Sequence, residues 1–63
     1  MRYYNDNEFV SGKTYVFMHP LGWTFESTVS RNVDKEGNST GPYYTDNKDN
    51  QQFKASTVLC KEA

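Results

Sequence analysis

The side chains with the greatest potential for chemistry are the single histidine, His19, and the single cysteine, Cys60. A catalytic thiol needs a base within hydrogen-bond reach, and a closed zinc site needs four ligands. His19 precedes Pro20 in a predicted turn, so we expect it to be a solvated loop residue. Cys60 falls in a predicted strand, where we expect a buried structural thiol. We therefore predict no catalytic residue, no metal site and no cofactor.

Paired carboxylates are the other route to acid–base chemistry, because one group can donate a proton while the other accepts one. Glu26 falls on the polar face of a predicted strand, and Glu8 belongs to a separate short element. The chain also lacks a glycine-rich phosphate loop and any cluster with metal-ligand spacing. We expect a protein that is not an enzyme.

The tyrosines form two adjacent pairs, Tyr3-Tyr4 and Tyr43-Tyr44. A strand turns successive side chains to opposite faces, so only one ring of each pair can point into a core. The other ring remains on the surface or against a partner, and exposed tyrosines are enriched at binding hot spots. We predict a partner-binding surface that contains Tyr3, Tyr4, Tyr43 and Tyr44.

The charge pattern bears on the kind of partner. The net charge is −1, and the seven basic residues are dispersed among eight acidic ones. A protein that holds a nucleic-acid backbone usually carries a basic stripe, so we favour a protein partner. Two alternatives remain open. One is a single-stranded nucleic-acid or nucleotide binder whose surface tyrosines stack on bases, and the other is a self-assembling structural protein.

The elements that must position these side chains start from the segment Trp23 to Arg31. Trp23, Phe25 and Val29 alternate with small polar residues, which is typical of a strand with one buried face. Lys13 to Met18 is also strand-like, and His19-Pro20-Leu21-Gly22 between the two segments has the composition of a tight turn. We predict a β-hairpin over residues 13 to 31, with the Trp23 ring in the core.

The second half of the chain is more polar. We expect a long mobile connection over Asn32 to Gly41, a short strand over Pro42 to Thr45 and a tight turn over Asp46 to Asn50. The last predicted strand runs from Gln51 to Cys60, and its apolar residues change phase midway. A β-bulge near residues 56 and 57 would turn both halves inward.

These elements make one domain over residues 1–63, all-β, with four to five strands. We predict a small antiparallel meander that forms an SH3-like small barrel or a curled sheet. A chain this short buries only ~60% of its unfolded surface, and one cysteine allows no internal disulfide. The second face of the Lys13 to Met18 strand carries Thr14, Val16 and Met18. We expect self-association through it, giving a homodimer or a small homo-oligomer.

The sequence also carries expectations about where the protein works. No apolar run approaches ~20 residues, and the N-terminus has no apolar signal-peptide segment. One cysteine and no signal fit the cytoplasm, with no membrane partner. The chain begins with Met1, as expected of a whole small gene product. We expect a non-enzymatic interaction module or inhibitor, of the kind made by phages and other mobile elements. It would bind its partner through exposed aromatic residues and a strand edge.

Overall fold

The computed structural model describes residues 1–63 and contains short antiparallel strands, two 3₁₀ turns and no α-helix. The all-β prediction is confirmed. There are more strands than predicted, because polar segments that were expected to be loops also pair. The elements are β1 (Arg2–Tyr3), η1 (Asp6–Glu8), β2 (Thr14–Met18), β3 (Thr24–Thr28), β4 (Ser30–Val33), β5 (Ser39–Asp46), β6 (Gln52–Lys54), η2 (Ala55–Thr57) and β7 (Leu59–Glu62).

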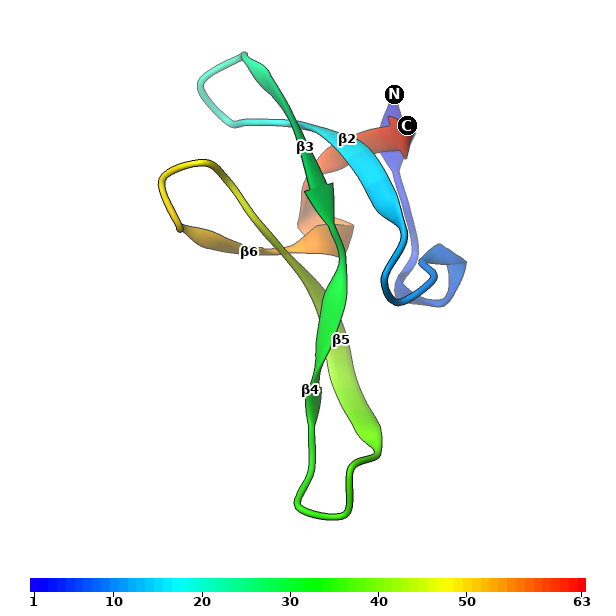
Figure 1. Cartoon of the computed structure of the whole chain (residues 1–63). Helices are drawn as coiled ribbons and strands as arrows, with labels where there is room; N and C mark the ends of the chain where they lie inside the picture. Colours follow the sequence, from blue (N-terminus) through cyan, green and yellow to red (C-terminus); the bar gives the residue numbers. More distant parts are fainter.

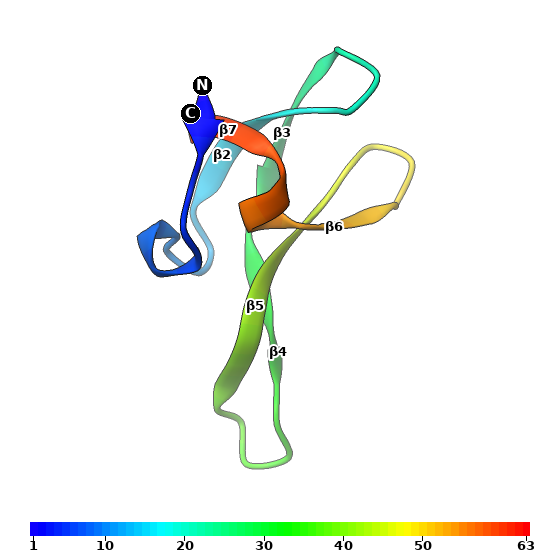
Figure 2. The same cartoon turned by 180° about the vertical axis from the view of Figure 1, so that it is seen from behind.

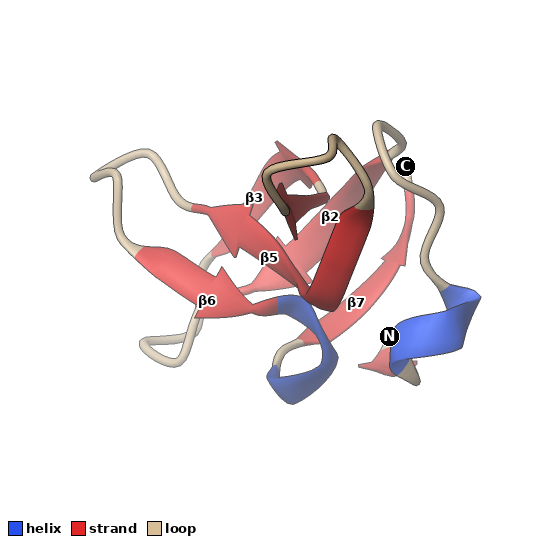
Figure 3. Cartoon of the chain, turned by 90° about the horizontal axis from the view of Figure 1, so that it is seen from below, coloured by secondary structure: helices blue, strands red, loops and turns tan.

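The strands form two sheets, and the chain passes from one sheet to the other at two corners. One sheet has the order β1-β7-β2-β3, and the other has the order β4-β5-β6. β3 runs on into β4 through the buried residue Val29, and η2 carries the chain from β6 to β7 (Figures 1 and 3). The two termini lie together because β1 pairs with β7. The result is a curled pair of sheets and not a closed barrel.

The predicted hairpin is confirmed as β2 and β3. Its register places Tyr15 opposite Ser27 and Phe17 opposite Phe25. The Gly22 N–H donates to the His19 carbonyl oxygen at 2.8 Å, which closes the expected four-residue turn. Gly22 has a φ of +102°, a conformation that glycine adopts without steric cost.

The core lies between the inner faces of the two sheets and is mainly aromatic. Phe17 is fully buried and stacks on Phe25 with ring centroids 5.7 Å apart. Tyr15 is buried beside it, as the alternation in β2 requires. The buried hydrophobic residues are Phe9, Tyr15, Phe17, Val29, Tyr43, Ala55, Val58 and Cys60. The prediction of a buried Cys60 thiol is confirmed.

The expected positions of Trp23 and His19 are wrong. Trp23 is half-buried and lies outside the core, with the Lys48 ammonium 5.0 Å from its ring centroid. His19 is only 7% exposed, and its imidazole stacks on the indole at 4.0 Å. The β5–β6 hairpin brings Phe53 against the same imidazole, with centroids 5.6 Å apart. Packing between two hairpins therefore buries a side chain that its own turn would leave in water.

Half of the connection expected over residues 32 to 41 is strand, and a five-residue turn joins the two strands. β4 and β5 continue as a hairpin that projects away from the body of the molecule (Figures 1 and 2). Its tight turn is organised by Asp34, whose Oδ1 accepts the N–H groups of Glu36 and Asn38 at 2.9 Å each. This side-chain cap replaces the long loop that the polar composition indicated.

The last predicted strand is divided by the 3₁₀ turn η2 and has no bulge at residues 56 and 57. The expected consequence is nevertheless observed, because Ala55, Val58 and Cys60 are buried and Phe53 packs against the core. The turn reverses the side-chain phase and moves the chain to the other sheet. β7 then runs to Glu62 and is paired on both sides, with β1 and β2.

Candidate functional site: an apolar hollow at the end of the four-stranded sheet

The site arises where the pairing of β2 with β7 stops. The last pair of the ladder joins Phe17 to Cys60, although β2 runs on to Met18 and β7 begins at Leu59. Beyond this pair the two strands separate. One enters the His19–Gly22 turn, in which Pro20 has no backbone N–H to pair, and the other comes from η2. The separation opens the sheet between its two central strands.

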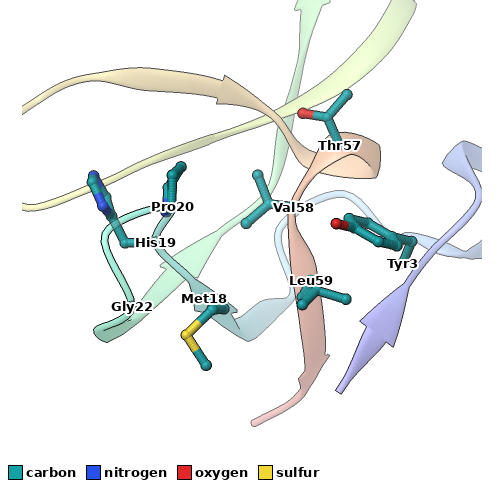
Figure 4. Close-up of a pocket in the computed structure, with 8 residues that line it drawn as sticks. All are labelled: Tyr3, Met18, His19, Pro20, Gly22, Thr57, Val58 and Leu59. Carbon is teal, nitrogen blue, oxygen red and sulfur yellow. The ribbon is translucent and has the colours of Figure 1, made fainter.

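This opening is a hollow of about 390 Å³. Its walls come from three parts of the chain that lie far apart in the sequence: β1, the end of β2 with its turn, and the segment from η2 into β7. Figure 4 shows the side chains from these segments around a common space. The lining residues are Tyr3, Met18, His19, Pro20, Gly22, Thr57, Val58 and Leu59.

The lining has no carboxylate, ammonium or guanidinium group. Val58 and His19 are buried and form its deeper part, while Tyr3 is 61% exposed at its mouth. The polar side-chain groups in the lining are the Tyr3 and Thr57 hydroxyls and the His19 imidazole, whose Nδ1 already accepts the Leu21 N–H. A single imidazole is too few ligands for a metal site, and no cluster of three ligating side chains is present. The surface suits an apolar group that leaves water on binding.

The structure separates the four tyrosines that were predicted to form one binding surface. Tyr43 is buried, and Tyr4 stacks on Phe9 with centroids 5.3 Å apart, so both rings belong to the core region. Tyr3 lines the hollow. Tyr44 lies on the outer face of the other sheet, where its strand neighbours are Ser30 and Lys54. Only one ring of each pair turns inward, as the alternation required, and the two outward rings do not share a surface.

The three residues predicted for self-association have different surroundings. The Thr14 hydroxyl lies 3.0 Å from the Thr28 hydroxyl across the outer face of the sheet. Val16 is half-buried between Glu26 on β3 and Lys61 on β7. Met18 lines the hollow. The apolar part of this face is therefore concentrated at the Met18 end.

Two ion pairs connect the terminal strands β1 and β7 to neighbouring segments of the chain. The Arg2 guanidinium donates to both carboxylate oxygens of Glu8, at 2.6 and 3.1 Å. Hydrogen bonds from this guanidinium and from the Asn5 N–H lower the pKa of Glu8 to about 2. Lys13 pairs with Glu62 at 2.8 Å, which ties β7 to the start of β2. The Lys61 to Ala63 segment is therefore held as strand through Glu62.

No three His, Cys, Asp or Glu side chains lie close enough together to hold a metal ion. The structure has no helix with the length and hydrophobicity that a membrane span requires.

Sequence reasoning missed most of the hollow. It identified Tyr3 and Met18 but not Pro20, Val58 or Leu59, because these residues meet only through the splayed end of the β2–β7 ladder. One local signal was present in the sequence. A tight turn with no charged residue, His19-Pro20-Leu21-Gly22, exposes a leucine where a polar residue is common.

No protein-family model, curated protein or solved structure matches this chain.

Proposed function

We propose that this chain is a non-enzymatic interaction module, and that it binds a protein partner by taking an apolar side chain of that partner into the hollow. The observation that carries the proposal is the composition of the hollow, which has no carboxylate, ammonium or guanidinium group and lies at the end of a sheet. Binding pockets are typically concave and apolar, with a few polar groups that fix orientation.

The size of the hollow supports a side chain as its occupant. An engineered protein cavity of ~150 Å³ holds a benzene ring, so about 390 Å³ accommodates one leucine or aromatic side chain with room for its backbone attachment. A hollow of this size gives specificity through one anchor residue, which is how many protein interfaces concentrate their binding energy.

Tyr3 is the residue of this chain that would contribute most to binding. Its ring is 61% exposed at the mouth of the hollow, and tyrosine brings a large contact area with few rotatable bonds. It also lies in β1, an edge strand of two residues whose outer side is unpaired. A bound segment would meet both the ring and the strand edge, the combination that the sequence led us to expect.

The test is a selection of random peptides displayed on phage against the immobilised chain. We expect enrichment of sequences with one large apolar residue, and we expect Tyr3→Asp to abolish their binding. Val33→Asp is the matched control, because Val33 is also 61% exposed and apolar but lies in the projecting β4–β5 hairpin. Equal binding by the wild-type and Tyr3→Asp chains, or no enrichment, would contradict the proposal.

A further inference from the structure

The most exposed large apolar side chain of the molecule is Leu21, at 82%. It occupies the third position of the His19–Gly22 turn, which is closed by the 2.8 Å backbone hydrogen bond. The Leu21 N–H also donates to His19 Nδ1 at 3.1 Å, and the imidazole is held between Trp23 and Phe53. The leucine is therefore presented on a well-supported turn, so little conformational entropy is lost when it binds.

Leu21 lies directly beside the hollow. Its two chain neighbours, Pro20 and Gly22, are both part of the lining, yet its own side chain points into solvent. The molecule thus carries an apolar projection and an apolar hollow next to each other. The chain's own fold leaves the projection out of the hollow.

We propose that a second copy of this chain fills the hollow. Two copies pair about a two-fold axis, and Leu21 of each enters the hollow of the other. This inference rests on the proposed function, because it assigns a partner to the same hollow. It is also more specific than the strand-face dimer expected from the sequence.

The arrangement favours a closed dimer because the projection and the hollow are adjacent. A two-fold axis that passes between them satisfies both contacts at once, which is the reciprocal form of an isologous interface. A projection and a hollow on opposite sides of the molecule would instead link copies into an open chain.

The charges permit the same contact. A two-fold axis brings identical groups of the two copies close together, so a charged residue near it would face its own copy. Neither Leu21 nor the lining of the hollow includes a carboxylate, ammonium or guanidinium group. The single copy buries only 11 of its 63 residues and has no disulfide. Pairing with a second copy would therefore stabilise the fold by burying further apolar surface.

The experiment is sedimentation equilibrium of four chains from micromolar to millimolar concentration: wild type, Leu21→Asp, Tyr3→Asp and Val33→Asp. All three substitutions fall at exposed apolar positions, so each variant keeps its fold, which circular dichroism checks. We expect a reversible wild-type dimer that stops at two copies. Each buried leucine contributes roughly 10- to 100-fold to association, so Leu21→Asp should weaken the dimer at least ~100-fold. Val33→Asp should dimerise like the wild type.

A mixing experiment tests reciprocity. Leu21→Asp keeps its hollow and Tyr3→Asp keeps its projection, so one intact contact remains possible between them. Adding unlabelled Tyr3→Asp to labelled Leu21→Asp should shift the Met18 and Leu59 methyl signals, while adding unlabelled Leu21→Asp should not. A strict wild-type monomer at millimolar concentration, growth beyond two copies, or dimers unaffected by Leu21→Asp would overturn the proposal.

The failure of this inference can be told apart from the failure of the proposed function. N-acetyl-leucine amide is titrated into the Leu21→Asp chain. Because no copy of this variant has a Leu21 side chain, its hollow stays free for the added ligand. Saturable shifts at Met18 and Leu59 with a monomeric wild type would overturn only the self-pairing. No shift at either methyl, together with a monomeric wild type, would overturn both.

Discussion

The structure makes Phe17 and not Trp23 the ring on which stability depends. Phe17 is fully buried and stacks on Phe25 and Phe9, with centroids 5.7 and 6.4 Å apart. Replacing a buried phenylalanine by alanine costs ~3–5 kcal/mol, because burial is lost and a cavity remains. A domain of 63 residues has a free energy of unfolding of roughly 3–9 kcal/mol, at ~0.05–0.15 kcal/mol per residue. Phe17→Ala therefore removes a large part of the stability, up to all of it.

Trp23→Ala should cost less than Phe17→Ala. The indole is half-buried, and the main specific contact it loses is the stack on His19, with centroids 4.0 Å apart. An aromatic pair contributes ~0.5–1.5 kcal/mol beyond its area, and the partly buried indole area adds roughly 1–2 kcal/mol, so we expect a total of about 2–3 kcal/mol.

Urea unfolding followed by circular dichroism measures the difference, since removing the single tryptophan excludes a fluorescence readout. We expect the Phe17→Ala transition at lower urea than that of Trp23→Ala. If Phe17→Ala is unfolded without denaturant, Phe17→Leu gives the measurable case, with an expected cost of roughly 1–2 kcal/mol. A cost for Trp23→Ala equal to or above that for Phe17→Ala would refute this description of the core.

Three further predictions concern single groups. The Arg2 guanidinium lowers the Glu8 pKa from 4.5 to about 2, so this pair stabilises the fold above pH 4.5 and its contribution is lost as the pH falls toward 2. Glu8→Gln should flatten that part of the curve of stability against pH. An unchanged curve would contradict the pairing. Burial raises the pKa of the Cys60 thiol, so a disulfide reagent should react with it only after unfolding, and rapid reaction with the native chain would contradict its burial. Trypsin should cut first after Lys35, at the exposed tip of the β4–β5 hairpin. Earlier cleavage after Lys13 would contradict the expectation that this tip opens more readily than the start of the central β2–β3 hairpin.

The alternation of apolar residues made the central hairpin predictable. β2 buries one face and β3 partly buries one, and the period-two pattern of the sequence indicates both directly. The β4–β5 hairpin could not be found in this way, because Val33 is the only apolar residue near its tip and is itself exposed. The Asp34 side chain caps the turn, and a single polar residue in a polar segment does not distinguish such a turn from a loop. Composition indicates exposure there, and exposure is compatible with either a loop or a strand.

The site was less predictable because its parts meet only in three dimensions. His19 is buried by Phe53, a residue of a different hairpin, and no local pattern reports such a contact. Tyr4 and Tyr43 were grouped with their outward neighbours because a strand pattern fixes alternation but not its phase in a short, apolar-poor segment. The hollow depends on where the β2–β7 ladder ends, and that point is set by the positions of two turns.

The most direct measurement is an isotope-filtered NMR experiment on an equal mixture of labelled and unlabelled wild-type chains at millimolar concentration. It reports only contacts between different copies. If Leu21 of one copy occupies the hollow of another, cross-peaks should join the Leu21 methyls to the Met18 methyl and to the Leu59 methyls of the second copy. These cross-peaks should weaken on dilution. No intermolecular cross-peak at Leu21, with methyl shifts that are independent of concentration, would contradict the pairing.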